Sequence, residues 1–402
     1  MAGYRDLLRT RGVARIISAQ LVARFPAGML SLAVLLHVEH VTGSYGSAGL
    51  VLAATSIGQA VAGPVTSRWM GVWGMRRVLT LTLLVCAGSV TALGLLPLPL
   101  PGYMLLGLLA GLSSPPVQAA VRTIYPKMVN SRQLTPLFSL DASAQEIIWV
   151  IAPVVTTFVA LQVGTVQAIM LIVVIMLVGG AWFISSPELG RVRIPRSRGG
   201  IGKVLTKPPV LLATVIGFLL IGGCAAVEAG VVATFDEGGL EAGLVLAVFS
   251  LGSLAGGLSM GHLPIGPWAM ARRLAVVAVG MTLATISLNV WWIGGTLLLA
   301  GIGIAPALAV LFAIVSASVK FSETAESYGW VGTGQLIGAA TGSAVAGFLI
   351  DGAGPGGAFW AAAAFLLVGT IVAVTCVRWF PDLRGRDPSP IPDTEPVPVT
   401  SP

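Results

Sequence analysis

The sequence predicts an all-α membrane protein, and three observations support this fold class. Of the 402 residues, 55% are hydrophobic and only 10% are charged, whereas soluble domains carry charge on about a quarter of their residues. The apolar residues form continuous runs such as LIVVIMLVGGAWFI, rather than the alternating pattern of a transmembrane barrel. Short polar or Gly/Pro clusters separate these runs at intervals that suit spanning helices, because about 20 apolar helical residues cross a bilayer.

Twelve apolar segments qualify as transmembrane helices. We expect them to form two six-helix bundles, at residues 1–184 and 209–380, joined by a cytoplasmic linker at 185–208. The proline-rich stretch 381–402 has no apolar period, so we expect a disordered cytoplasmic tail. The segments begin near residues 13, 46, 77, 102, 134, 165, 209, 241, 273, 293, 324 and 357.

The basic residues predict the orientation of these spans. Lys and Arg near helix ends collect on the cytoplasmic side, and all 23 basic residues except Arg24 fall on one side. Among them, we assign Arg122, Lys127 and Arg132 to the loop between the fourth and fifth spans. Both termini are therefore expected in the cytoplasm, and the chain in the cell (inner or plasma) membrane. This asymmetry explains the net charge of +7, so no nucleic-acid partner is expected.

The two halves of the chain repeat one another. Residues 48–63 and 242–257 are identical at nine of sixteen positions, including the opening AGLVLA. Two further pairs of segments, 109–121 with 299–311 and 138–145 with 328–335, correspond at an offset of 190 residues. Six spans return the chain to its starting side, so a duplicated six-helix unit gives two bundles of the same orientation. Such bundles can rock about a midplane site, which predicts alternating access.

Small residues and prolines predict how some of the spans pack. In span 11, Gly338 and Gly342 lie four residues apart, and such spacing favours close helix contact. We therefore expect span 11 to face the other bundle. Pro115 and Pro116 in span 4 match Pro306 in span 10, and we expect both spans to be kinked, because prolines bend helices.

Two segments carry a family resemblance. Residues 63–79, GPVTSRWMGVWGMRRVL, resemble the G-x-x-x-D-R-x-G-R-R loop between helices 2 and 3 of the major facilitator superfamily. The segment IIWVIAPVVTT, with Pro153, is similar to the G-P-x-x-G-G motif of that family's antiporters. The resemblance covers nearly the whole chain and implies the twelve-helix fold of the family in a bacterial, efflux-type transporter.

The loop motif is degenerate. Only Gly74 and Arg76 match it, Ser67 stands for its first glycine, and Gly71 stands for its aspartate. In the family, this aspartate helps to hold the two bundles together in one state, so the sequence does not predict that latch. By resemblance, the gating residues are expected to be Gly63, Ser67, Gly71, Gly74, Arg76 and Arg77 in this loop, with Pro153 on span 5.

Charged side chains inside the spans are few, and each needs a partner or a function, because an ionised group at the bilayer centre costs at least ~2.5 kcal/mol. Arg24 lies well inside span 1, with Gln20 one turn before it on the same face. On span 5, Asp141 and Gln145 share a stripe, and Glu146 points elsewhere. Helices 1 and 5 are neighbours in the family, so Arg24 is expected to contact Asp141 or Glu146. A structural ion pair and a substrate or proton role remain alternatives.

Two further acidic residues lie on the predicted spans, Glu228 on span 7 and Glu326 on span 11. Glu228 lies on span 7 without a basic residue near it in sequence, and by resemblance helix 7 lines the central cavity. It is a candidate proton site beside Glu146, with an outward-facing rim carboxylate as the alternative. Glu326 opens span 11, where an acidic residue at a helix N-terminus is ordinary dipole complementarity.

These residues together predict a secondary transporter of a small organic solute, such as a drug, a metabolite or a sugar-like compound. We expect proton-coupled export, with proton-coupled uptake or a uniporter as the alternative and a transport-inactive sensor or scaffold as the alternative from another class. The substrate and proton pathway is expected to contain Gln20, Arg24, Asp141, Gln145, Glu146 and Glu228. No enzyme activity, cofactor or metal is expected, and the expected partners are the solute, protons and the bilayer around a monomer.

Overall fold

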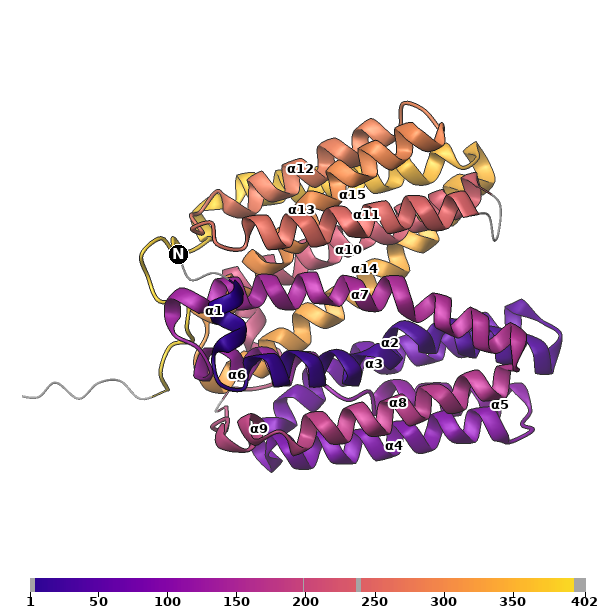
Figure 1. Ribbon diagram of the computed structural model, residues 1–402, viewed down its shortest axis with the longest axis horizontal. Coiled ribbons are helices and arrows are strands. Elements are labelled where there is room, and N and C mark those ends of the chain that lie inside the picture. Colours follow the sequence, from indigo (N-terminus) through magenta and orange to yellow (C-terminus); the bar gives the residue numbers. More distant parts are fainter. Residues whose placement is uncertain (1–3, 198, 236–239, 394–402) are drawn as a thin grey trace, which may run out of the picture.

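The computed structural model describes residues 4–197, 199–235 and 240–393 as a bundle of long, roughly parallel helices (Figure 1). Within these ranges the only strand-like feature is an isolated bridge between Lys320 and Ile391. Eleven of the described helical segments are long and apolar enough to cross a membrane. The twelfth segment, α12, has 16 residues and is shorter than the others. The all-α fold predicted from the sequence is confirmed.

The N-terminal bundle follows the predicted spans closely, because its helices begin within a few residues of the predicted starts. A short helix, α1 (Tyr4–Arg9), precedes it. The bundle consists of α2 (Val13–Thr42), α3 (Tyr45–Trp73), α4 (Met75–Leu95), α5 (Leu100–Leu112) with α6 (Val117–Ile124) and the 3-10 turn η1 (Tyr125–Lys127), α7 (Ser131–Gln162) and α8 (Thr165–Ser185).

The C-terminal bundle repeats this order after a connection that contains α9 (Pro187–Arg191) and the 3-10 turn η2 (Lys203–Thr206). It ends in a third 3-10 turn, η3 (Val377–Trp379). Its helices are α10 (Pro208–Thr234), α11 (Leu240–Met260), α12 (Ala269–Ala284), α13 (Val290–Ser318), α14 (Phe321–Ala353) and α15 (Gly356–Thr375).

The duplicated sequence produces duplicated packing. In the first bundle, α3 packs on α5 so closely that a Cβ atom on Gly58 would lie 2.6 Å from the carbonyl oxygen of Leu108. In the second, α11 packs on α13, and a Cβ atom on Gly252 would lie 2.4 Å from the carbonyl oxygen of Leu298. Because Gly58 and Gly252 are matched positions in the repeat, the same glycine brings the same two helices together in both bundles.

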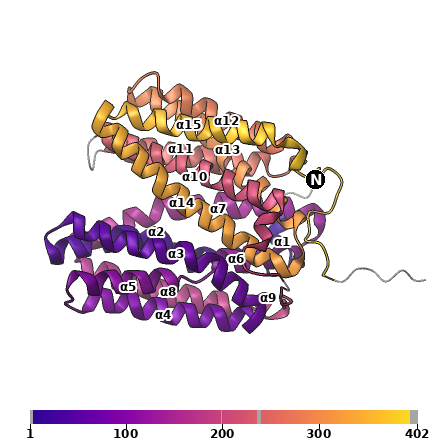
Figure 2. The same cartoon turned by 180° about the vertical axis from the view of Figure 1, so that it is seen from behind.

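The two bundles meet along two matched seams. One is formed by α3 and α14 and the other by α7 and α11, with α13 also packed against α7. Both seams lie near the end that carries α1, α6, α9 and the loop before α14, and the ribbons of the two bundles diverge toward the opposite end (Figures 1 and 2). We call the first end the basic end, because it carries Lys127, Arg191 and Lys207.

The prolines act differently in the two bundles. Span 4 is broken at Pro115 and Pro116, which separate α5 from α6. In contrast, α13 continues as one helix through Pro306. The carbonyl oxygen of Pro306 accepts a hydrogen bond of 2.8 Å from Nη1 of Arg273 on α12. The break in span 4 allows α6 to take its own direction, and this helix carries part of the site described below.

The small residues of α14 also pack differently from the prediction. Gly338 and Gly342 face α10 of their own bundle, where added Cβ atoms would lie 2.2 and 2.0 Å from the carbonyl oxygens of Phe218 and Gly222. The helix does reach the other bundle, but earlier in its sequence. There a Cβ atom on Gly329 would lie 2.6 Å from the carbonyl oxygen of Gly63.

The first part of the tail departs from the expectation of disorder. The backbone N–H of Leu383 donates to the carbonyl of Ile265, at 2.9 Å. Ile391 pairs with the segment before α14, and the Asp393 carboxylate accepts from the backbone N–H and hydroxyl of Ser322. Residues 381–393 therefore tie together two loops of the C-terminal bundle. Residues 394–402 lie outside the described part of the chain.

Candidate functional site

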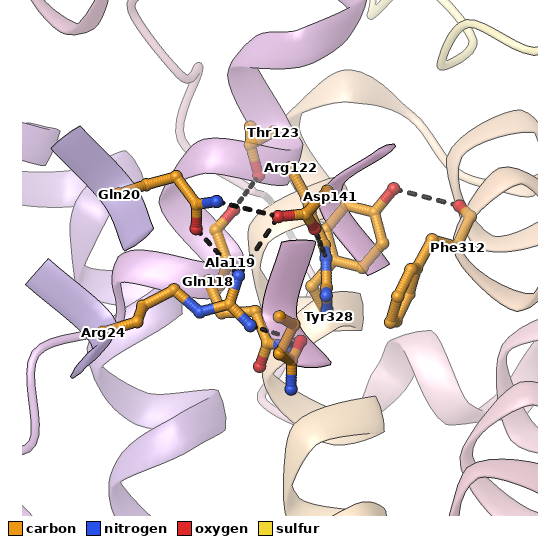
Figure 3. Close-up of polar contacts among 10 residues, drawn as sticks. Gln20, Arg24, Gln118, Ala119, Arg122, Thr123, Asp141, Phe312 and Tyr328 are labelled. Atoms are coloured by element: carbon orange, nitrogen blue, oxygen red, sulfur yellow. Dashed lines mark hydrogen bonds and ion pairs between the residues drawn. The ribbon is translucent and has the colours of Figure 1, made fainter. Parts of the chain in front are cut away.

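A buried cluster of charged side chains occupies the centre of the N-terminal bundle, where α2, α6 and α7 meet. Asp141 on α7 accepts at Oδ1 from Nε2 of Gln20 and Nη1 of Arg24, both at 3.1 Å. Its Oδ2 accepts from Nε of Arg122, at 3.0 Å. In Figure 3, Gln20 and Arg24 approach Asp141 from the left, from α2. All three partners donate to one carboxylate, which is fully buried.

Of the two partners predicted for Arg24, the structure shows Asp141 and not Glu146. Arg24 bonds to Asp141 and, through Nη2, to the amide oxygen of Gln145. It also donates from Nη1 to Gln20, at 2.8 Å. The alternative partner, Glu146, is not bonded to it among the described contacts. The stripe on α7 therefore contributes to the cluster as the helical spacing predicted, with Asp141 and Gln145 on the same side.

Arg122 is the member of the cluster that the sequence analysis missed. It was assigned to a cytoplasmic loop, yet only 2% of its surface is exposed and it bonds to Asp141. The break at Pro115 and Pro116 starts a new helix that carries Gln118 and Arg122 one turn apart. The repeat contained the signal: the offset of 190 places Arg122 opposite Phe312, deep inside span 10.

The C-terminal bundle covers this cluster with aromatic rings. The guanidinium carbon of Arg122 lies 3.4 Å from the ring centroid of Phe312 on α13. The Tyr328 hydroxyl on α14 donates to the carbonyl oxygen of Phe312, at 3.0 Å. The ring of Phe138 on α7 lies 6.5 Å from each of these two rings. A cation stacked on an aromatic face is stabilised by up to about 2 kcal/mol when desolvated, so this contact joins the bundles at the cluster.

Two further carboxylates lie within the spans, Glu146 on α7 and Glu228 on α10. Glu146 accepts a hydrogen bond of 2.9 Å from the hydroxyl of Ser253 on α11, across the seam. Glu228 on α10 has an exposed side chain. Among the described residues, neither carboxylate forms an ion pair.

The degenerate loop motif contacts the rest of the molecule along its length. A Cβ atom on Gly63 would lie 3.0 Å from Oγ1 of Thr333, at the seam, and the buried Ser67 hydroxyl has no partner among the described residues. A Cβ atom on Gly71 would lie 3.2 Å from the carbonyl oxygen of Pro195, and Gly74 has a φ of 87° between α3 and α4.

The remaining predicted gating residues lie farther from the seam. Arg76 donates to the carbonyl oxygen of Ser186, at 3.1 Å, and so bonds within its own half of the molecule. Arg77 is exposed, and Pro153 lies within the continuous helix α7. The structure therefore does not bring the predicted gating residues together into one contact.

The latch that the sequence did not predict is present with different residues. Nη1 of Arg68 on α3 lies 2.9 Å from Oε2 of Glu326 on α14, an ion pair between the bundles in which Glu326 is buried. Arg68 also donates to the carbonyl oxygen of Gly199, and Glu326 accepts from the backbone N–H of Gly202, at 2.8 Å. The interpretation of Glu326 as simple dipole complementarity was therefore wrong, because it missed this partner.

The matched seam has a weaker, uncharged contact. The hydroxyl of Tyr4 on α1 donates to the carbonyl oxygen of Gly257 on α11, at 2.9 Å, and Ser139 on α7 donates to the same oxygen, at 2.6 Å. Burial raises the pKa of Tyr4, against a smaller opposing effect of the neighbouring Ser139 hydroxyl. The phenol therefore remains protonated, and a donor, throughout the neutral range.

Two helical bundles that repeat one another in sequence and packing, joined along two seams at one end, define a membrane transporter built by duplication. A model of the Major Facilitator Superfamily matches residues 16–296 and 230–401, and the chain belongs to this family. No curated protein matches the sequence.

Solved structures share the fold at low sequence identity. A bacterial homologue of the iron transporter ferroportin, in an outward-facing state, superposes with a TM-score of 0.76 at 14% identity, covering 92% of this chain and 99% of that one. The human organic anion transporter MFSD10 gives a TM-score of 0.70 at 14% identity, with 90% and 99% covered. A proton:xylose symporter gives 0.72 at 13% identity, with 93% and 97% covered. These likenesses concern the fold alone.

Proposed function

We propose that this chain exports a small organic solute in exchange for protons, by alternating access between its two bundles. The observation that carries the proposal is a pair of carboxylates within the spans, Glu146 at the seam between the bundles and Glu228 on α10, neither of which forms an ion pair among the described residues. Acidic side chains inside a membrane are costly and mark ion or proton pathways. They are therefore the groups that we assign to proton binding.

In the proposed mechanism, the two bundles separate from each other along the seams. At the basic end, close glycine contacts and a few hydrogen bonds hold α3 against α14 and α7 against α11. Together with the Arg68–Glu326 ion pair, these contacts close the basic end, and alternating access requires them to break when the bundles rock and the other end closes. Basic residues favour the cytoplasmic side, so we assign the basic end to the cytoplasm and this conformation to a state that is closed toward it.

The direction of transport is proposed from the sequence and not from a contact in the structure. The antiporter-like segment around Pro153 favours export, and the family contains transporters that work in either direction. The similar structures concern an iron transporter homologue, an organic anion transporter and a proton:xylose symporter. Because their solutes differ, they do not select one for this chain. Uptake with protons and uniport are the alternative outcomes of the experiment.

Counterflow in proteoliposomes tests the proposal. The full chain is reconstituted with a lumenal pH dye, and a panel of neutral, cationic and anionic solutes is offered with and without an imposed pH gradient. We expect solute movement against proton movement, which Glu146→Gln and Glu228→Gln abolish. The matched control is Glu241→Gln, an exposed carboxylate in the first turn of α11, which should leave coupling unchanged.

Other outcomes identify the alternatives. Solute that moves in the same direction as protons would indicate proton-coupled uptake. Movement that ignores the gradient would indicate a uniporter, and would exclude a proton role for Glu146 and Glu228. No movement of any solute, in vesicles where the protein is shown to be folded, would favour a sensor or scaffold.

A further inference from the structure

The charged cluster in the N-terminal bundle holds more positive than negative charge. It contains two guanidinium groups, on Arg24 and Arg122, and one carboxylate, on Asp141. Asp141 is the one carboxylate that contacts either guanidinium within the described ranges, and both of its oxygens are already used. A surplus positive charge is therefore left in a region where charge is expensive.

Three guanidinium nitrogens converge on a single point, and only one of them, Nη2 of Arg24, also donates elsewhere, to Gln145. With its amide oriented as its neighbours require, Gln118 places its oxygen 2.8 Å from both Nη1 and Nη2 of Arg122. The same oxygen lies 3.1 Å from Nη2 of Arg24. Three nitrogen donors from two arginines thus surround one neutral acceptor. Guanidinium forks of this kind match carboxylate and phosphate oxygens far better than an amide, because charged acceptors form the stronger hydrogen bonds.

The convergence point is also the open side of the cluster. Arg122, Asp141 and Gln20 are almost completely buried, whereas Gln118 and Gln145 are only half-buried. Phe312 covers the guanidinium of Arg122 from the other bundle, but an aromatic face offsets only part of a buried charge. Gln118 and Gln145 are therefore the side chains of the cluster that a ligand can reach most readily.

We propose that the Arg24–Arg122 pair binds an anionic group of the transported solute, a carboxylate or a phosphate, whose oxygen replaces the amide oxygen of Gln118. The inference rests on the proposed transport function, but on neither its direction nor its coupling ion. It gives Gln118 a definite role as a neutral side chain that occupies the anion position in the empty protein. It also separates two sites, with the solute anion at α2 and α6 and the proton carboxylates on α7 and α10.

The sharpest test is Gln118→Glu, which places a carboxylate of the same size at the convergence point. We expect this variant to melt at a temperature several degrees above the parent chain, because the built-in anion neutralises the surplus charge. The matched control is Gln335→Glu on α14, the position that corresponds to Gln145 in the other bundle, where no arginine is bonded. That variant should melt at or below the parent temperature.

The second arm uses paired probes on the full-length protein in detergent or nanodiscs. Benzoate and inorganic phosphate should raise the melting temperature of the parent chain, whereas benzamide and glycerol should not. In Gln118→Glu the shift by the anions should disappear, and Arg122→Lys, which keeps the charge but loses the fork, should reduce it.

Two results would overturn the inference. One is a Gln118→Glu variant that melts no higher than the parent or that keeps its response to anions. The other is a parent chain stabilised equally by benzoate and benzamide. Neither result would contradict the transport proposal, because the counterflow experiment can still show proton-coupled transport of a neutral or cationic solute. Conversely, a chain that binds anions without moving them would leave this site standing and remove the transport proposal.

Discussion

Residues 118–145 of the N-terminal bundle and residues 308–335 of the C-terminal bundle are matched regions of the repeat, and they touch where the bundles meet. Along the seams they keep similar small residues: Ser139 and Ser143 correspond to Gly329 and Thr333. One pair of contacts is matched: Ser139 bonds to the carbonyl oxygen of Gly257, and its counterpart Gly329 packs on Gly63, where an added Cβ atom would lie 2.6 Å from the carbonyl oxygen.

At their centres the two regions differ completely. The positions of Gln118, Arg122 and Asp141 in the first bundle correspond to Leu308, Phe312 and Val331 in the second. One copy supplies the polar groups, and the other supplies the apolar wall that covers them, with Arg122 stacked on its own counterpart Phe312. The duplicated unit therefore keeps the packing that both bundles need and confines the charged chemistry to one of them.

The largest effect should come from removing the negative charge at this centre. Asp141→Asn leaves two buried guanidiniums without a carboxylate, and breaking a buried pair in this way costs about 3–5 kcal/mol. We expect a large loss of folded protein and a much lower melting temperature. Asp351→Asn, the same change at an exposed position near the end of α14, should stay within about 0.5 kcal/mol of the parent. A stable Asp141→Asn protein would show that the cluster does not need its carboxylate.

The fold and part of this centre were predictable from the sequence because the signals are local. Hydropathy predicted the helix starts to within a few residues, and the helical period placed Asp141 and Gln145 on one stripe. The Arg24 contact followed from the resemblance, which made helices 1 and 5 neighbours. In each case, a regular pattern or a family likeness carried the necessary information.

The other features of the site depend on contacts between residues far apart in the sequence, and no local pattern predicts such contacts. Arg122 lies among the basic residues used to orient the spans, and this pattern places it in a loop, although α6 carries it into the core. Glu326 satisfied a helix N-terminus rule, so its partner Arg68, 258 residues away in sequence, was not sought. Gly338 and Gly342 do support close packing, but spacing alone cannot tell which neighbouring helix they meet.

A smaller effect is expected at the seam between α3 and α14. Gly329→Ala would place a Cβ atom 2.6 Å from the carbonyl oxygen of Gly63, and relieving such an overlap costs about 1–3 kcal/mol. Because the strain exists only when the seam is closed, we expect the open state of the basic end to gain population. Spin labels at Arg77→Cys and Arg272→Cys, in a Cys376→Ser background, should show a new, longer distance.

The matched control for this variant lies one turn along the same helix. A Cβ atom on Gly332 would have no neighbour within 4 Å, so Gly332→Ala should leave the spin-label distances unchanged and stabilise α14 slightly. If both variants gave the same distances, the close contact of Gly63 with Gly329 would not limit the opening of the seam.

The smallest expected effect is the difference between two seam variants, Arg68→Gln and Tyr4→Phe, which ranks the seams by their polar contacts. Arg68→Gln leaves the buried Glu326 with only the Gly202 N–H, and hydrogen bonds to charged groups contribute about 1.5–3 kcal/mol. Tyr4→Phe removes a neutral bond worth about 0.5–1.5 kcal/mol, and the Gly257 carbonyl keeps its bond from Ser139. With the same spin-label pair, Arg68→Gln should open the basic end more than Tyr4→Phe. The reverse order would mean that the α7–α11 seam, and not the ion pair, holds the closed state together.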